Sequence, residues 1–216
     1  ELLFRRLLHL LSLVVEQPNV PLRTISLLSR EEQRTLLEDF NDTSVSYPKG
    51  KTVVDLLGKM VSIHPERTAL FSGSQEVTYA HLYRLASRYA GYMREKGVES
   101  GDVVALLPVY TAESVAAIFA ILMCGGIYMP LDSAHPAERL EHFLVQAKAK
   151  FLILMDHSIR LRFTGNRITL AEIPDGEEIP FSHRSCANPY AYFLFTSGSS
   201  GEPKGVRVRH DSLMNY

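Results

Sequence analysis

The stretch that decides the fold is Tyr192-Phe-Leu-Phe-Thr-Ser-Gly-Ser-Ser-Gly-Glu-Pro-Lys-Gly-Val206. Its first four residues form an apolar run, which predicts a buried strand. The loop that follows mixes glycines with hydroxyl side chains, and Lys204 adds a cation. Glycines let backbone N–H groups turn inward, so the array suits a polyanion the size of a nucleotide triphosphate. The candidate phosphate-binding residues are Thr196, Ser197, Gly198, Ser199, Ser200, Gly201 and Lys204.

This loop differs from the Walker phosphate loop, which ends in Gly-Lys-Ser/Thr and opens a helix. Here Pro203 precedes Lys204, and the residue before a proline is pushed away from helical backbone angles. The alternating residues Val206 to Arg209 then predict a second strand, with its arginines on a solvated face. The alternative is a flexible Ser/Gly linker. The strong apolar flanks and the single embedded lysine argue against that alternative.

The segment from Thr196 to Gly205 closely resembles the phosphate-loop signature of the adenylate-forming enzymes, with Ser200 where the usual version has threonine. That family includes nonribosomal peptide synthetase adenylation domains, acyl-CoA synthetases and luciferases. Matches that follow the family's order are more specific than any single match. The further stretches that resemble family elements are Val77–Leu82, Leu122–Asp132 with its continuation Pro136–Leu140, and His210–Asn215.

The Tyr-x-Pro-Leu-Asp form that ends at Asp132 resembles the peptide-synthetase branch of the family. Residues 1–50 resemble the C-terminal tail of a condensation domain and its linker. Residues 51–216 resemble the N-terminal portion of an AMP-binding adenylation domain, which would be truncated. Glu1 is not an initiator methionine, and Tyr216 falls just after a helix is expected to start. We therefore expect an excerpt of a longer polypeptide.

Patterns along the second part of the chain predict an open α/β sheet with flanking helices. Apolar runs at Val103–Leu107 and Phe151–Leu154 predict buried strands, and Ile127–Met129 predicts a short one. Val115–Met123 and the segment from Pro136 predict helices between them. Strands that alternate with helices are typical of an open sheet with helices packed on it.

The N-terminal part is expected to form a helical linker region. Leu2–Val15 has the pattern of an amphipathic helix, and Ser29 with Glu32 predicts a capping box at the start of another. Thr78 can cap a third helix. By contrast, the polar segment from His157 to Pro189 is expected to be irregular.

The composition excludes several classes of function. The chain has 216 residues, enough for one ordinary domain with a core. Its 23 basic and 24 acidic residues give no general attraction for nucleic acid or for an anionic membrane. Cys124 and Cys186 match no ligand spacing and indicate reduced thiols in a cytoplasm. The histidines show no metal spacing, and the apolar run Val115–Met123 is too short to span a bilayer.

The resemblance implies ATP-dependent activation of an amino acid as aminoacyl-AMP, with release of pyrophosphate. A second step would hand the acyl group to a phosphopantetheine thiol on a carrier domain. Mg²⁺ and the loop donors would stabilise charge at phosphorus. The partners would be the condensation and carrier domains of the same synthetase. Thr196, Ser197, Ser199 and Ser200 would hold the β- and γ-phosphates, Gly198 and Gly201 would permit their close approach, and Lys204 would steady the loop and the departing pyrophosphate.

No catalytic residue is assigned within the chain. The family's amino-acid pocket, its ribose-binding aspartate and its catalytic lysine would lie beyond Tyr216, so the excerpt alone is expected to be inactive. One alternative is an acyl-CoA synthetase-type ligase. Another is an amidase-type Ser/Lys hydrolase, which also uses a Gly-Ser-Ser-Gly loop and needs an upstream lysine, for which Lys148 and Lys150 are the candidates. A third is a non-catalytic linker with a subdomain.

Overall fold

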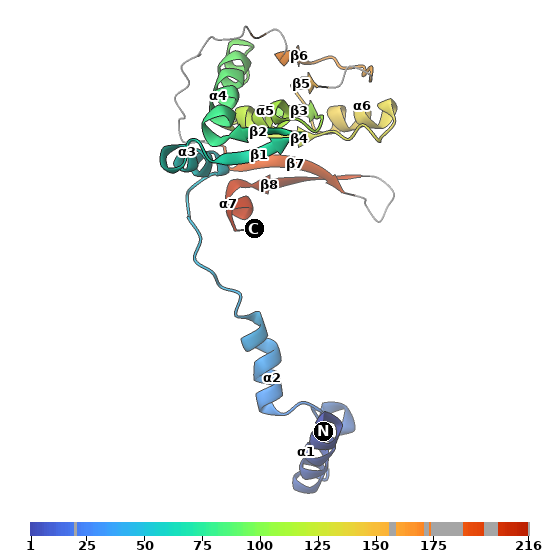
Figure 1. Cartoon of the computed structure of the whole chain (residues 1–216). Coiled ribbons are helices and arrows are strands. Elements are labelled where there is room, and N and C mark those ends of the chain that lie inside the picture. The colour runs from blue at the N-terminus through green and yellow to red at the C-terminus, as the bar shows by residue number, and fades with distance from the viewer. Residues whose placement is uncertain (20, 156–158, 171–172, 174–187, 197–202, 216) are drawn as a thin grey trace. The chain divides into compact units, whose positions relative to one another are not determined.

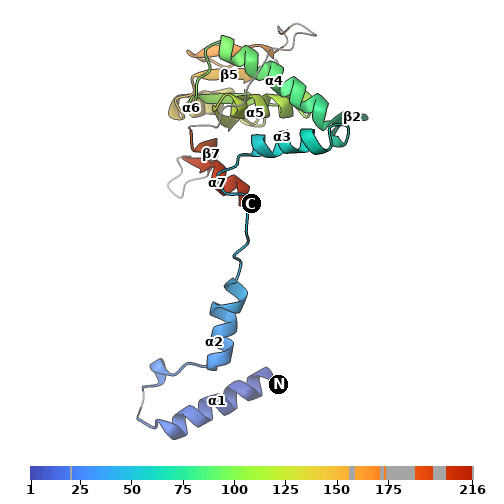
Figure 2. The same cartoon turned by 90° about the vertical axis from the view of Figure 1, so that its left-hand side faces the viewer.

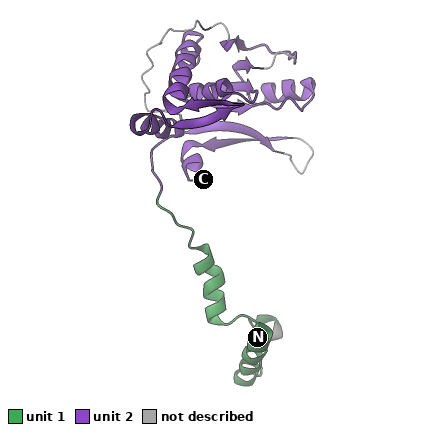
Figure 3. Cartoon of the chain, viewed as in Figure 1, with its two compact units in different colours: residues 1–46 green, residues 47–216 purple. Residues whose placement is uncertain are grey.

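The computed structural model describes residues 1–19, 21–155, 159–170, 173, 188–196 and 203–215 (Figure 1). The chain divides into two compact units, residues 1–46 and residues 47–216 (Figure 3). Among the described residues, no helix has both the length and the apolar character needed to cross a bilayer.

The first unit consists of the helices α1 (Leu2–Glu16) and α2 (Arg30–Leu37) and the short 3-10 helices η1 (Leu22–Thr24) and η2 (Asp39–Asn41). The predicted capping box opens α2: Glu32 N donates to Ser29 Oγ at 3.1 Å, and Ser29 N donates to Glu32 Oε2 at 2.9 Å. The hydrogen bond that the Ser29 backbone N–H donates to the Glu32 carboxylate lowers the pKa of Glu32. All residues of α1 and α2 are described and none is buried, so neither helix contributes to a core.

The second unit begins with α3 (Val53–Ile63), which a capping box between Thr52 and Asp55 opens. A hairpin of β1 (Thr68–Ser72) and β2 (Gln75–Thr78) follows, and Gly73 takes a φ of 62° at its turn. Helix α4 (Tyr79–Glu95) starts at the predicted cap, where His81 N donates to Thr78 Oγ1 at 3.2 Å.

The main sheet has the strand order β6-β5-β3-β4-β7-β8. The neighbouring strands from β6 to β7 pair in parallel, and β8 pairs antiparallel with β7. This architecture confirms the predicted open α/β sheet. The strands are β3 (Val103–Leu107), β4 (Ile127–Pro130), β5 (Phe151–Leu154), β6 (Asn166–Ile168), β7 (Tyr190–Thr196) and β8 (Lys204–Arg209).

Helices cover the two faces of the sheet. Val104 and Leu106 of β3 join a core with α4 and α5 (Ala112–Met123), whereas Val103, Ala105 and Leu107 join a second core with α6 (Ala137–Gln146). Every residue of β3 is therefore buried, as the continuous apolar run predicted. The short α7 (His210–Met214) follows β8 and contacts α3 (Figure 2).

Strand β7 joins the sheet beside β4, where Tyr128 of β4 is the partner of Tyr192 of β7. Burial at this place raises the pKa of Tyr128 to about 12. The strand predicted at Tyr192–Phe195 is present, but it is only partly buried: Phe193 is buried, whereas Leu194 is 37% exposed. Strand β7 is therefore less buried than central β3, whose residues are all buried.

Among the described residues of the segment 157–189, strand β6 is a regular element that the sequence did not predict. Strand β6 pairs in parallel with β5, and Leu161, Ile168 and Leu170 in this segment are buried. The strand escaped prediction because it has three residues, of which two are polar.

Candidate functional site

The candidate site is the turn end of the β7–β8 hairpin. Thr196 is the last residue of β7, Lys204 is the first residue of β8, and the two are paired across the hairpin. Thr196 Oγ1 donates to the Lys204 carbonyl oxygen at 3.4 Å, and both residues are exposed. The structure thus brings together two of the predicted phosphate-binding residues. The others, Ser197, Gly198, Ser199, Ser200 and Gly201, lie outside the described residues.

This hairpin end lies at the carboxyl edge of the parallel strands (Figure 1). After β3 the chain passes to β4 on one side, and it then returns to β5 on the other side of β3. In open α/β sheets, ligands bind beyond the carboxyl ends of the strands, close to such a reversal of strand order. Thr196 and Lys204 therefore occupy the edge of the sheet where a ligand is expected.

Aromatic side chains tie the end of β7 to α6. The ring of Phe195 stacks on that of Phe143 in α6, with centroids 4.3 Å apart and planes 11° apart. Phe193 meets Phe195 edge to face at 5.1 Å, and Phe193 is only 7% exposed. Stacked and edge-to-face pairs add stability beyond the apolar area that they bury. The stem of the hairpin is therefore fixed to the helix beside it.

Two contacts define the start of β8. Gln146 Nε2, at the end of α6, donates to the Pro203 carbonyl oxygen at 3.2 Å. Gly205 lies against the ring of Phe193, because a Cβ atom added at Gly205 would meet Phe193 Cζ at 2.4 Å. Sequence reasoning missed both contacts. An aromatic residue near a cross-strand glycine is a known pairing device, but Gln146 gives no comparable signal.

The arginines of β8 contact residues other than those of the candidate site. The guanidinium of Arg207 lies 5.6 Å from the ring centroid of Tyr190. Arg209 is the partner of Tyr190 at the opposite end of the hairpin, and its Nε donates to Asp211 Oδ1 at 3.0 Å. That hydrogen bond lowers the pKa of Asp211 and raises that of Arg209. These contacts agree with the prediction that the arginines lie on a solvated strand face.

The lysines that a Ser/Lys hydrolase would need lie at the amino ends of the parallel strands, opposite the carboxyl ends where Thr196 lies. Lys150 precedes β5, and its Nζ is 3.1 Å from Asp102 Oδ2, just before β3. Lys148 also precedes β5 and has a φ of 53°. Both lysines are therefore at the amino ends of the parallel strands, whereas Thr196 is at a carboxyl end. This geometry argues against the amidase-type site.

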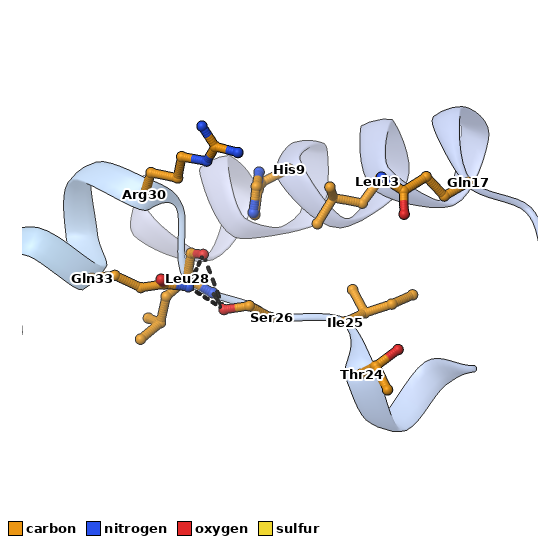
Figure 4. Close-up of a pocket in the computed structure, with 9 residues that line it drawn as sticks. All are labelled: His9, Leu13, Gln17, Thr24, Ile25, Ser26, Leu28, Arg30 and Gln33. Carbon is orange, nitrogen blue, oxygen red and sulfur yellow. Dashed lines mark hydrogen bonds between the residues drawn. The ribbon is translucent and has the colours of Figure 1, made fainter. Parts of the chain in front are cut away.

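A cavity of about 250 Å³ lies in the first unit and contains none of the candidate residues (Figure 4). At its wall, Ser26 Oγ accepts from Gln33 Nε2 at 2.7 Å and from Leu28 N at 3.2 Å. These polar groups bind one another rather than converge on a ligand. The lining residues are His9, Leu13, Gln17, Thr24, Ile25, Ser26, Leu28, Arg30 and Gln33.

Comparison with known proteins identifies the family. Gramicidin S synthase 2 of Brevibacillus brevis is 34% identical, over 100% of this chain and 5% of that protein. Bacitracin synthase 1 of Bacillus licheniformis is 36% identical, over 96% of this chain and 4% of that protein. The chain therefore spans a small part of the length of these curated relatives.

A solved structure of a peptide synthetase is also similar to this chain. The nonribosomal peptide synthetase FmoA3, in its α-methyl-L-serine-AMP bound form, has 26% identity and a TM-score of 0.73. The similarity covers 94% of this chain and 23% of that one. The family described as AMP-binding enzyme matches residues 59–216, which include the whole β7–β8 hairpin. Because this match covers more than half of its residues, the chain belongs to the AMP-binding enzyme family.

Proposed function

We propose that the chain is the N-terminal part of a nonribosomal peptide synthetase adenylation domain. Its proposed activity is ATP-dependent formation of an aminoacyl-AMP, followed by transfer of the acyl group to a phosphopantetheine thiol on a carrier domain. The main support is the position of Thr196 and Lys204 at the carboxyl edge of the sheet, within the segment that matches the family. Similarity to synthases of gramicidin S and bacitracin supports an amino acid as the substrate.

In the proposed reaction, an oxygen of the amino-acid carboxylate attacks the α-phosphorus of ATP. The bond between that phosphorus and the oxygen bridging to the β-phosphorus breaks, and pyrophosphate leaves with its negative charge. Lys204 is an exposed cation that can oppose this charge, and charge-assisted contacts are the stronger ones. The residues proposed to bind the β- and γ-phosphates are Thr196, Ser197, Ser199 and Ser200, with Gly198 and Gly201 allowing close approach.

We propose that Mg²⁺ arrives with ATP. Among the described residues, no group of three or more His, Cys, Asp or Glu side chains is placed to hold a metal ion. Mg²⁺ commonly binds through substrate phosphates and water with only one or two carboxylates. A site formed by hydroxyls, backbone N–H groups and Lys204 is therefore compatible with Mg·ATP. When bound, the ion would neutralise phosphate charge.

We propose that residues 1–50 are the tail of a condensation domain and its linker to the adenylation domain. Support comes from the match to gramicidin S synthase 2, which covers 100% of this chain and so includes these residues. Helix α1 exposes large apolar side chains, among them Leu3 at 83% and Val15 at 78%. Such a surface suits burial against a neighbouring domain of the same synthetase. A cytoplasmic location remains a prediction.

The test of the phosphate-binding role is Lys204→Ala in the synthetase that contains this chain. A hydrogen bond to a charged group contributes about 1.5–3 kcal/mol, so amino-acid-dependent ATP–pyrophosphate exchange should fall about tenfold to a hundredfold. The readout is the exchange rate at saturating amino acid over a range of Mg·ATP concentrations.

Lys59→Ala is the matched control, because Lys59 is an exposed lysine on α3, away from the hairpin. Its exchange rate should equal that of the wild type. Unchanged exchange in Lys204→Ala would refute the role assigned to the hairpin.

A further inference from the structure

We infer that Gln146, on α6, is a positioning residue for Lys204, and this inference rests on the proposed role of Lys204 in phosphate binding. Gln146 Nε2 donates to the carbonyl oxygen of Pro203 at 3.2 Å. Pro203 immediately precedes Lys204, although it lies 57 residues from Gln146 in the sequence. The bond therefore fixes the backbone next to the lysine from outside the hairpin.

The backbone at Lys204 needs such an anchor because it stands at the last pair of the β7–β8 ladder, at the turn end of the hairpin. Lys204 and Thr196 form the terminal pair of the β7–β8 register. The hydroxyl of Thr196 reaches the Lys204 carbonyl oxygen only at 3.4 Å, which is long for an O–H donor. Pro203 has no N–H group, so its carbonyl is the one main-chain group that it can offer for attachment. Gln146 uses that group.

Helix α6 is a rigid support for this amide. Its residues Leu140, Phe143 and Leu144 are buried in the core, so the helix is held against the sheet. Phe143 also stacks on Phe195, which precedes Thr196. The same helix therefore contacts the end of β7 through a ring and the start of β8 through an amide. Helix α6 therefore contacts both strands at the candidate site.

Position matters for this lysine because its ammonium group is a point charge on a flexible four-carbon stem. The stem cannot define where the charge lies, so the backbone anchor must do so. Loss of the anchor should lower the fraction of molecules whose ammonium group meets the phosphates. Gln146 itself need not touch ATP for this effect, and it therefore acts through Lys204.

The test is a double-mutant cycle with Gln146→Met and Lys204→Ala in the intact synthetase, read as kcat/KM for Mg·ATP in pyrophosphate exchange. Methionine keeps the length of the side chain but removes the N–H donor. Because the amide is exposed and water competes, the loss should be about threefold to tenfold in the wild-type background. In the Lys204→Ala background Gln146→Met should cause no further loss, since coupled residues are not additive.

Two further variants complete the test: one shortens the side chain of Gln146, and the other is a control at a distant glutamine. Gln146→Asn keeps the amide but is one methylene shorter, so it should lose as much as Gln146→Met. Gln75→Met is the matched control, because it makes the same chemical change at an exposed glutamine on β2. All three single variants should unfold at the wild-type temperature.

Each outcome decides the question. Equal losses from Gln146→Met in both backgrounds would show a merely structural effect and overturn the inference. Absence of any loss in Gln146→Met would also overturn it. Unchanged exchange in Lys204→Ala would instead show that the proposed function of the lysine is wrong, and the inference would fall with it.

Discussion

At the scale of the residue, Gly205 shows how tightly the candidate site is built. A Cβ atom there would meet Cζ of Phe193 at 2.4 Å and Cε1 at 2.8 Å, so a ring atom would have to move. Phe193 is buried and contacts Phe195, so that movement disturbs the stem below Thr196 and Lys204. Glycine at this position is explained by close approach and not by an unusual backbone angle.

We predict that Gly205→Ala destabilises the protein, because overpacking a core usually costs about 1–3 kcal/mol. The measurement is the free energy of unfolding in urea. Gly58→Ala, in α3, is the control: a Cβ atom there meets nothing within 4 Å, and alanine favours a helix over glycine by about 0.5–1 kcal/mol. A Gly205→Ala protein as stable as the wild type would contradict the tight packing against Phe193.

Local residue patterns also set the limit of what the sequence could predict about the site. The hydroxyl and lysine pattern around Thr196 and Lys204 is contiguous, so it was visible without a structure. Gln146 was invisible, because an exposed amide on a helix has no pattern and its partner lies 57 residues away. The Phe143–Phe195 stack was hidden for the same reason, since it joins two segments that are distant in sequence.

At the scale of the element, burial decides which strands the sequence predicts. The strands β3 and β5 lie inside the sheet, so they read as continuous apolar runs and were predicted correctly. The edge strand β6 has only three residues, two of them polar and exposed, and it was missed. The burial of β7 was overestimated because its apolar run does not show which of its faces a helix covers.

Helix starts were predictable wherever a side-chain cap lies close in sequence. Ser29 with Glu32 and Thr78 were predicted from their spacing and accept the expected backbone hydrogen bonds. Thr52 and Asp55 have the same spacing and form a capping box too, with Thr52 N donating to Asp55 Oδ2 at 2.7 Å. Caps are local, so they need no knowledge of the fold.

At the scale of the whole molecule, the connector between the two units is a described segment without regular structure. Residues 42–48 form no helix or strand, and apart from the half-buried Tyr47 they are exposed. The division between the units falls between Ser46 and Tyr47. Exposed backbone without regular structure is the preferred substrate of proteases.

We therefore predict that limited proteolysis cuts within residues 41–51 before it cuts Val103–Leu107. The expected products are a fragment that ends near residue 46 and a fragment that keeps the sheet, identified by mass spectrometry. Elastase, which cleaves after small residues, is a suitable probe, since the connector contains Val45 and β3 contains Ala105. Early cleavage inside β3 with the connector intact would contradict the division into two units.

The strand order has a consequence for the time course of folding. The segment from β3 to β5 pairs strands that are close in sequence, whereas β7 joins the sheet at Tyr128, far upstream of its own Tyr192. Contacts between distant segments require closure of a long loop and form late. Strand β8 is in addition an exposed edge strand of the described sheet, whereas β3 is central and buried. We predict that the amides of Lys204–Arg209 exchange with deuterium sooner than those of Val103–Leu107. Equal protection would contradict this order. If the hairpin opens while the central strands stay paired, the proposed nucleotide site is lost although the rest of the sheet keeps its fold.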